Sequence, residues 1–414
     1  MKIRIHTSNN WPIVLAVTLL TLFSYTLDFI GIVFPGAVLM LSVIGLLFWW
    51  IFVKGKNLII LSSPSLICYF LLIIIDVLST VANGWDISSF NLRYIAIFFI
   101  PLFFLFFYGG LDEDYKIDRM LSIIDVVFWI SFGLFLIQQL FMGFTHQDYL
   151  SGVFGTTMGN DGFTNIFLCI ALIYVLVSYT HKKKSLKYLI CVVLASLYQA
   201  IVGEIKVYFF ELLLIVLIVY MFEKPSLKSF VAIIGVVAGV SISVYILGLV
   251  YPYFKDFFTL SNMIELIGSD KGYTGVGDIN RLNGVSILKS LCENDFQVWF
   301  GHGLGSAYNT SDFYLRYSYL HFNWFSHTYI FTEVGILGLA VTMFGFVFEA
   351  VKCIYGAVKE EDENLKIYFK MSAIICLLMP LLFIYNIKLL TEIGALMISL
   401  FVALPYAYIK NNKE

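Results

Sequence analysis

Charged residues are scarce in this chain of 414 residues. Lysine, arginine, aspartate and glutamate make up 13% of it, against 60% hydrophobic and 18% aromatic residues. A soluble domain has about 25% charged residues, so half that share is too little to cover a water-soluble protein of this size. The composition excludes a disordered chain, and the net charge of −2 excludes binding of nucleic acid through a basic surface. We therefore expect an integral membrane protein.

Paired cysteines and clustered metal ligands are also missing. The six cysteines form no CxxC pair, and five of them lie in or beside apolar runs, where a lone cysteine acts as a small hydrophobic residue. The sixth, Cys292, is the only cysteine of a long polar segment, so that segment closes no internal disulfide. No HxxxH motif or acid cluster falls in the predicted external loops, so we expect neither a metal nor a cofactor.

Long apolar runs are what the sequence does contain. A helix needs about 20 apolar residues to cross a bilayer, and we find twelve such runs: 12–28, 31–53, 64–83, 94–110, 120–142, 162–180, 187–203, 206–222, 229–250, 325–351, 367–386 and 389–408. We therefore predict an all-α polytopic membrane protein with about twelve transmembrane helices. The seventh and eighth runs are separated by only a few polar residues, so one bent pair is the alternative there.

Lysine and arginine gather in alternate short loops, beginning with Lys2 and Arg4 and ending with Lys410 and Lys413. The positive-inside rule then places both termini in the cytoplasm. The chain divides accordingly into an N-terminal bundle of about nine spans (1–250), an external segment with short amphipathic helices (251–324), and C-terminal spans with a cytoplasmic tail (325–414).

Three groups of residues near the predicted external ends of the spans carry a resemblance to a known family. They are Arg281 with Gly301, Gly303, Gly305 and Ser306; Ser326 and His327 with Glu333, Gly335, Ile336 and Gly338; and Glu204-Ile205-Lys206 before the eighth run. With these motifs the chain resembles the O-antigen and capsular polysaccharide polymerases (Wzy-type) and the O-antigen ligases. It departs from the family at Thr328, where Asn is common, and at Lys206, where ligases tend to have Arg.

The resemblance implies an architecture like that of the GT-C glycosyltransferases, with one large external segment. It also implies transfer of glycan from an undecaprenyl-diphosphate-linked donor to a lipid-linked acceptor, on the outer face of a bacterial inner or plasma membrane. Membrane lipids and a chain-length regulator protein are further implied partners, and nucleic acid is not one. The reaction implied is an inverting, metal-independent transfer.

The candidate site residues suit this chemistry. A cation stabilises the negative charge that develops on a diphosphate leaving group, and arginine does so with bidentate contacts. We assign this role to Arg281 and Lys206, although Lys206 could instead pair with Glu204. We assign the base to His327, with His321 as its rival. The remaining substrate-binding candidates are Glu204, His302, Arg316 and Glu333, the last of which could only pack inside the bundle.

Two other functions stay open at this point. A ligase would move finished glycan to a lipid A core or a protein, and the sequence separates it poorly from a polymerase. A multi-span transporter or flippase is the alternative from another class. We see neither the symmetric halves nor the charges buried in mid-span that it would require.

Overall fold

The computed structural model describes residues 11–58, 62–84, 96–111, 113–142, 149–223 and 277–412, together with Tyr273 and scattered residues between 234 and 249. Throughout these ranges the secondary structure is helical and contains no strand. The predicted all-α architecture is thereby confirmed for the described part of the chain. Most of the ninth apolar run (229–250) and of the polar segment that follows it lies outside the described residues.

Seven helices are long and apolar enough to cross a membrane. They are α2 (Gly36–Phe48) with its π-helical continuation η2 (Trp49–Val53), α3 (Pro64–Ala82), α5 (Asp114–Leu140), α6 (Asp161–Thr180), α15 (Ser326–Lys359), α16 (Glu363–Tyr385) and α17 (Glu392–Asn411). Four shorter apolar helices accompany them: α1 (Trp11–Leu22), α4 (Phe99–Gly110), α7 (Leu186–Val202) and α8 (Tyr208–Met221). Each of the other eleven predicted runs therefore contains an apolar helix, and seven of these helices reach spanning length. Such helices indicate a protein embedded in a membrane.

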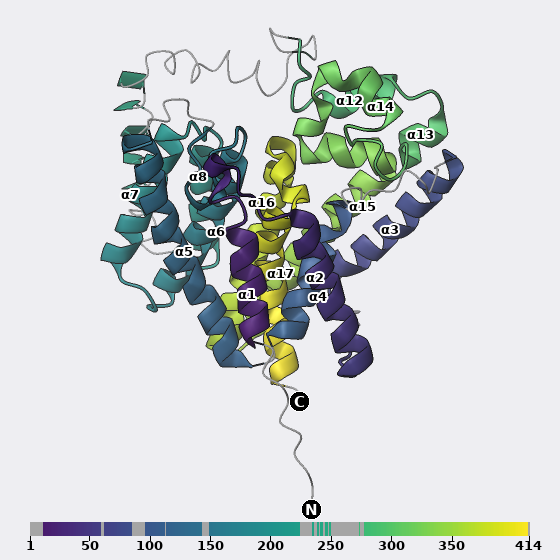
Figure 1. Cartoon of the computed structure of the whole chain (residues 1–414). Coiled ribbons are helices and arrows are strands. Elements are labelled where there is room, and N and C mark those ends of the chain that lie inside the picture. The colour runs from purple at the N-terminus through teal and green to yellow at the C-terminus, as the bar shows by residue number, and fades with distance from the viewer. Residues whose placement is uncertain are drawn as a thin grey trace, which may run out of the picture.

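The C-terminal helices form the centre of the bundle. α15 packs along both α3 and α16, and α17 packs against α4 and α16. In Figure 1, α16 and α17 lie in the middle, α5 to α8 lie on one side, and α3 leans away on the other. α6 and α17 are almost entirely enclosed by other helices, because their apolar residues occur all round the helix. The start of α1 and the end of α17 lie at one end of the bundle, which we call the termini end.

The opposite end carries residues 277–325, which we call the cap. The cap contains three short helices, α12 (Gly284–Ser290), α13 (Asp295–Phe300) and α14 (Asp312–Tyr317), followed by the 3-10 turns η7 (Ser318–Leu320) and η8 (Phe322–Trp324). Figure 1 shows the cap beside the far end of α3. α12 and α13 both pack on α15, so the cap is held directly by a spanning helix.

The seventh and eighth runs form two helices, not one bent helix. α7 ends at Val202 and α8 begins at Tyr208. Glu204 between them has a left-handed backbone conformation, with φ of 52°. A non-glycine residue in that region marks a tight turn, which lets the chain reverse direction within five residues.

Candidate functional site

Helix α15 is broken near its cap end. Gly335 has φ of 65° and ψ of −164°, which no α-helix accommodates. The break removes the normal partners of the carbonyl groups one turn earlier. Two amide groups of the cap replace them: His302 N donates to Thr332 O at 2.8 Å, and Gly303 N donates to Glu333 O at 2.9 Å. The predicted glycine turn of 301–306 therefore docks into the break and satisfies backbone groups that a membrane would leave unpaired.

Glycine is required on both sides of this contact. A Cβ atom on Gly301 would lie 2.4 Å from the carbonyl carbon of Glu333, and one on Gly335 would lie 2.4 Å from the carbonyl carbon of Trp299. Both glycines also have positive φ, which other residues rarely adopt. The two glycine motifs seen in the sequence thus meet each other in space.

Two buried carboxyl groups lie beside the glycine turn. Glu333 on α15 is 0% exposed and Asp76 on α3 is 1% exposed, and the two interact electrostatically across the interface. Glu333 Oε1 accepts a hydrogen bond from Gly305 N at 3.0 Å, and Tyr329 on the same helix interacts electrostatically with this carboxyl group. Glu333 Oε2 and Asp76 Oδ1 have no hydrogen-bond partner. Unsatisfied carboxyl oxygens at such depth are costly, so they mark this place as functionally significant.

Arg281 and His327 lie together where the cap meets α15 and α16. His327 Nε2 is 2.8 Å from Arg281 O, and Nδ1 is 3.2 Å from Phe383 O. Each ring nitrogen faces a carbonyl oxygen, although a neutral imidazole can donate a hydrogen bond to only one of them. Neither nitrogen is therefore open to a third group. His327 thus connects the backbone before α12 to α16, and two residues that belong to separate sequence motifs lie in contact.

The guanidinium group of Arg281 rests on aromatic rings. Its Cζ lies 4.9 Å from the centre of the Tyr385 ring and 5.3 Å from that of Phe325. Its Nε is buried without a hydrogen-bond partner, and no carboxylate in the described ranges lies within ion-pair distance of it. A guanidinium held by rings rather than by an acid keeps its charge and its donors for an anion.

His321 forms a pair with an acid of the cap. Its Nδ1 lies 2.5 Å from Asp278 Oδ1, and its ring stacks on Trp324 with centres 4.0 Å apart. Ile279 N donates to Leu320 O at 3.3 Å, which ties the segment before Arg281 to the turn that carries His321. The structure therefore brings His321, His327 and Arg281 into one region of the protein.

The other two candidates of the cap have plain structural surroundings. His302 packs on the Phe313 ring at 4.2 Å, and burial lowers its pKa to about 4, so it is neutral at physiological pH. Cys292, whose Sγ lies 3.9 Å from His302 Nε2, has its pKa raised to about 11 by burial. Arg316 is an exposed residue that pairs with Glu293 at 3.6 Å.

Lys206 and Glu204 lie in the turn between α7 and α8, where Lys206 Nζ is 3.5 Å from Glu204 Oε2. The pairing considered from the sequence is therefore present. Figure 1 shows α7 and α8 on one side of the bundle and the cap, which carries Arg281, on the other. Lys206 thus belongs to a different group of helices from the other candidate cation.

A cavity of about 510 Å³ opens beside the Arg281 region, between the cap and the starts of α2, α4 and α17. Its polar lining residues include Tyr25, Tyr308, Asn309, Asn323, Tyr329 and Glu392. We call it the cap-end cavity. Asn323 and Ile387 of its wall stand two residues from Phe325 and Tyr385, the two rings under Arg281. None of the eight candidates named from the sequence lines this cavity itself.

Glycine also shapes the cap-end cavity. Glu392, in the first turn of α17, packs against Gly36 at the start of α2, where a Cβ would lie 2.3 Å from Glu392 Oε1. The N-terminus of a helix favours a negative side chain in this position. The cavity therefore combines a carboxylate with amides and aromatic hydroxyls, a set of groups that suits the hydroxyls and apolar faces of sugars.

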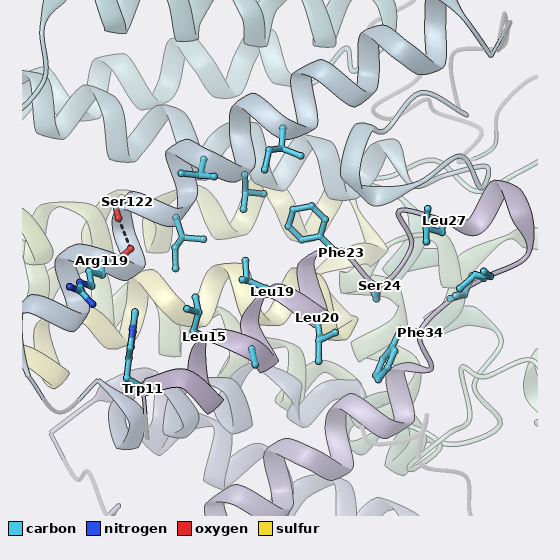
Figure 2. Close-up of a pocket in the computed structure, with 17 residues that line it drawn as sticks. Trp11, Leu15, Leu19, Leu20, Phe23, Ser24, Leu27, Phe34, Arg119 and Ser122 are labelled. Atoms are coloured by element: carbon cyan, nitrogen blue, oxygen red, sulfur yellow. Dashed lines mark hydrogen bonds between the residues drawn. The ribbon is translucent and has the colours of Figure 1, made fainter. Parts of the chain in front are cut away.

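A second hollow, of about 1050 Å³, runs between α1 and α5 and is almost wholly apolar. Figure 2 shows Leu15, Leu19 and Phe23 lining it, with Arg119 and Trp11 near one end and Phe34 near the other. We call it the apolar groove. The chain from Ser24 to Phe34 contributes to its wall, and the cap-end cavity takes Tyr25 and 35–37 from the same stretch. One segment therefore separates an apolar hollow from a polar one.

Sequence reasoning missed several of these residues. Asp76, Tyr329 and Glu392 were assigned no role from the sequence. Lys388 had a signal, because cations are rare in the predicted external loops. It lies 3.3 Å from Asn160 Oδ1 and 4.7 Å from the Phe163 ring, and burial lowers its pKa.

Within the part of the chain that the structure describes, no three histidine, cysteine or acidic side chains are grouped as they would be around a metal ion. A comparison with protein-family models finds no match to this chain, and a comparison with curated proteins finds none either.

Proposed function

We propose that this protein is a membrane glycosyltransferase that polymerises lipid-linked glycan repeat units. The observation that carries the proposal is the cap-end cavity, with sugar-compatible groups on its wall and with Asn323 and Ile387 of that wall two residues from the aromatic rings that hold the Arg281 guanidinium. The apolar groove, on the other side of the same segment, offers room for a prenyl chain. The separation of polar and apolar hollows matches a ligand with a glycan at one end and a lipid at the other.

Arg281 would act on the leaving group. As the bond between the anomeric carbon and the diphosphate oxygen breaks, negative charge grows on the diphosphate, and a preorganised guanidinium lowers the energy of that state. The aromatic rings of Phe325 and Tyr385 hold the guanidinium without neutralising it. Lys388 is a further candidate cation. It lies in the turn between α16 and α17, directly after Ile387, which lines the cavity.

The base is the second requirement. The sequence assigned it to His327, with His321 as the rival. For His327 that role requires one of its two carbonyl contacts to open. For His321 the contact with Asp278 fixes the ring and leaves Nε2 as the acceptor, which is the usual arrangement of a histidine base. A glycan hydroxyl would lose its proton to one of these rings as it attacks.

The test uses cells that lack this chain and are complemented with variants. We expect Arg281→Ala to reduce a long glycan ladder to single repeats, and Arg281→Lys to restore part of it, because lysine keeps the charge but not the bidentate contact. Lys289→Ala, an exposed cation of α12, is the matched control and should leave the ladder intact. A full ladder in Arg281→Ala would refute the assignment. Accumulation of polymer on its lipid carrier would instead identify a ligase.

A transporter is the second candidate, because one observation favours it specifically. α15 is a broken spanning helix, and Glu333 and Asp76 are carboxyl groups buried beside the break. Discontinuous helices with buried acids are typical of ion-coupled transporters. Counterflow of labelled lipid-linked glycan in proteoliposomes, without elongation of that glycan, would decide for this function.

A further inference from the structure

The Asp76–Glu333 pair has no role in the proposed transfer. It is nevertheless the most unusual electrostatic feature of the α3–α15 interface. Both side chains are fully buried, both carry an oxygen without a partner, and no lysine or arginine of the described residues forms an ion pair with either. Two ionised carboxylates at this depth would repel each other without compensation. No cation of the described residues offsets this repulsion, and a shared proton would remove it.

The surroundings of Glu333 allow one carboxylate but not two. Gly305 N donates to Glu333, which is what an ionised carboxylate needs, and Tyr329 interacts with the same carboxyl group. Asp76 has no such donor on Oδ1. Among the described residues, the titratable groups that face the pair from the packed elements are Tyr329 on α15 and Tyr308 in the cap. Neither supplies a positive charge.

The pair is connected to the cap-end cavity. Tyr329 lines that cavity and interacts electrostatically with Glu333, and Tyr308 lines the same cavity. Glu333 also holds the glycine turn through Gly305, while Thr80, one turn after Asp76, accepts a hydrogen bond from Leu304 N at 2.9 Å. α3 and α15 therefore both form hydrogen bonds with the same turn of the cap.

We propose that Asp76 and Glu333 form a proton-binding site that holds one proton between them at neutral pH and communicates with the cap-end cavity through Tyr329. Binding of the proton converts one carboxylate to a carboxylic acid, which donates to the other and removes the repulsion. Loss of the proton leaves two charges across the α3–α15 interface and loosens its hold on the glycine turn. The inference does not depend on whether the cavity serves transfer or transport.

The first experiment measures the proton directly, on the full-length protein in nanodiscs. Infrared absorption of protonated buried carboxyl groups is recorded as pH is raised. We expect a band at neutral pH that disappears in alkaline solution, shifts in Asp76→Asn and in Glu333→Gln, and is absent from the double variant. These replacements keep the shape of a protonated acid, so the double variant should fold. A wild-type protein without the band, or a double variant that retains it unchanged, would overturn the proposal.

The second experiment tests the connection to the cavity. Tyr329→Phe removes the polar hydroxyl that interacts with Glu333, so the carboxylate is less stabilised and the band should persist to higher pH than in the wild type. Tyr408→Phe is the matched control, because its hydroxyl donates to Asp362 at the termini end. An identical titration in Tyr329→Phe and wild type would show that no coupling exists. As a second readout, the thermal midpoint of the wild type should fall above neutral pH, and that of the double variant should not.

Discussion

Helix α15 carries two fully buried glutamates that face α3, and their surroundings are opposite in kind. Near the termini end, Glu349 accepts from Ser63 Oγ at 2.7 Å, from Ser65 N at 3.1 Å and from Ser65 Oγ at 2.9 Å, and also from the Tyr406 hydroxyl. Near the cap, Glu333 has an oxygen without a partner and an acid for a neighbour. The same residue type on the same helix thus forms a structural anchor at one end and a frustrated site at the other.

This difference shows which end is built for change. A buried carboxylate that accepts four hydrogen bonds from oxygen and nitrogen donors is held in place by them. A carboxyl group with unmet bonding capacity changes its state when a proton or ligand arrives. Local violations of good packing are expected at functional sites, because elsewhere they cost stability without benefit. We therefore place function at the cap end and rigidity at the termini end.

The largest effect is expected at the anchor. Glu349→Gln replaces an acceptor by an amide whose NH2 group faces hydroxyl donors, so it should destabilise the protein by about 3 kcal/mol. The measurement is the thermal midpoint of the purified protein. Glu361→Gln, an exposed glutamate on the loop after α15, is the control and should have no effect. An unchanged midpoint in Glu349→Gln would remove the contrast between the two ends.

The break in α15 should be nearly as sensitive. Gly335→Ala forces positive φ on alanine and brings its Cβ to 2.4 Å from Trp299, so we expect a loss of about 2 kcal/mol or more and a displaced cap. Gly45→Ala, in α2 with nothing within 4 Å of its Cβ, should be neutral or stabilising. Limited proteolysis of the cap, followed over time, reports the displacement. Equal resistance in both variants would contradict the docking of the turn.

His302 gives the cap a dependence on acid. Its pKa falls from about 6.5 in the unfolded chain to about 4 in the folded one. The unfolded chain therefore binds more protons between these values, and stability is full above pH 6.5 and lost as pH falls towards 4. The loss is at most about 3 kcal/mol. Thermal midpoints at pH 7 and pH 5 should differ less in His302→Gln than in the wild type, and an equal difference would exclude this residue.

Glu333→Gln should behave unlike Glu349→Gln. The substitution removes the repulsion from Asp76 while keeping the shape of the side chain. We therefore expect the free energy of unfolding to change by less than about 1 kcal/mol at neutral pH, in either direction. Circular dichroism melts of the two variants side by side provide the measurement. A loss as large as that of Glu349→Gln would mean that both ends are anchors.

Arg316→Ala should have the smallest effect. Its pair with Glu293 is exposed on both sides, and exposed pairs contribute less than about 1 kcal/mol. The thermal midpoint should be unchanged within error in buffer of physiological salt. A clear drop would indicate that the exposed surface of the cap contributes to its docking, in addition to the glycine turn and the packing of α12 and α13 on α15.

The sequence predicted the helices well and the contacts poorly. An apolar run predicts a helix from the local sequence alone. The runs that lie in the described ranges therefore correspond to observed helices. Partners distant in the chain leave no local signal: Ser63 meets Glu349 across 286 positions, and Asp76 meets Glu333 only because α3 and α15 pack. The family resemblance named both Arg281 and His327 as site residues, but the contact of the His327 ring with the carbonyl oxygen of Arg281 has no sequence signal. The break at Gly335 was not foreseen either, since one glycine in an apolar run reads as ordinary helix.

The strip of chain between α1 and α2 has a consequence of its own. Because it walls the apolar groove on one flank and the cap-end cavity on the other, neither hollow can widen at its expense without the other becoming narrower. A lipid that entered the apolar groove from the bilayer and displaced this segment would thus change the shape of the cap-end cavity. The occupancy of the apolar groove is thereby coupled mechanically to that of the cap-end cavity.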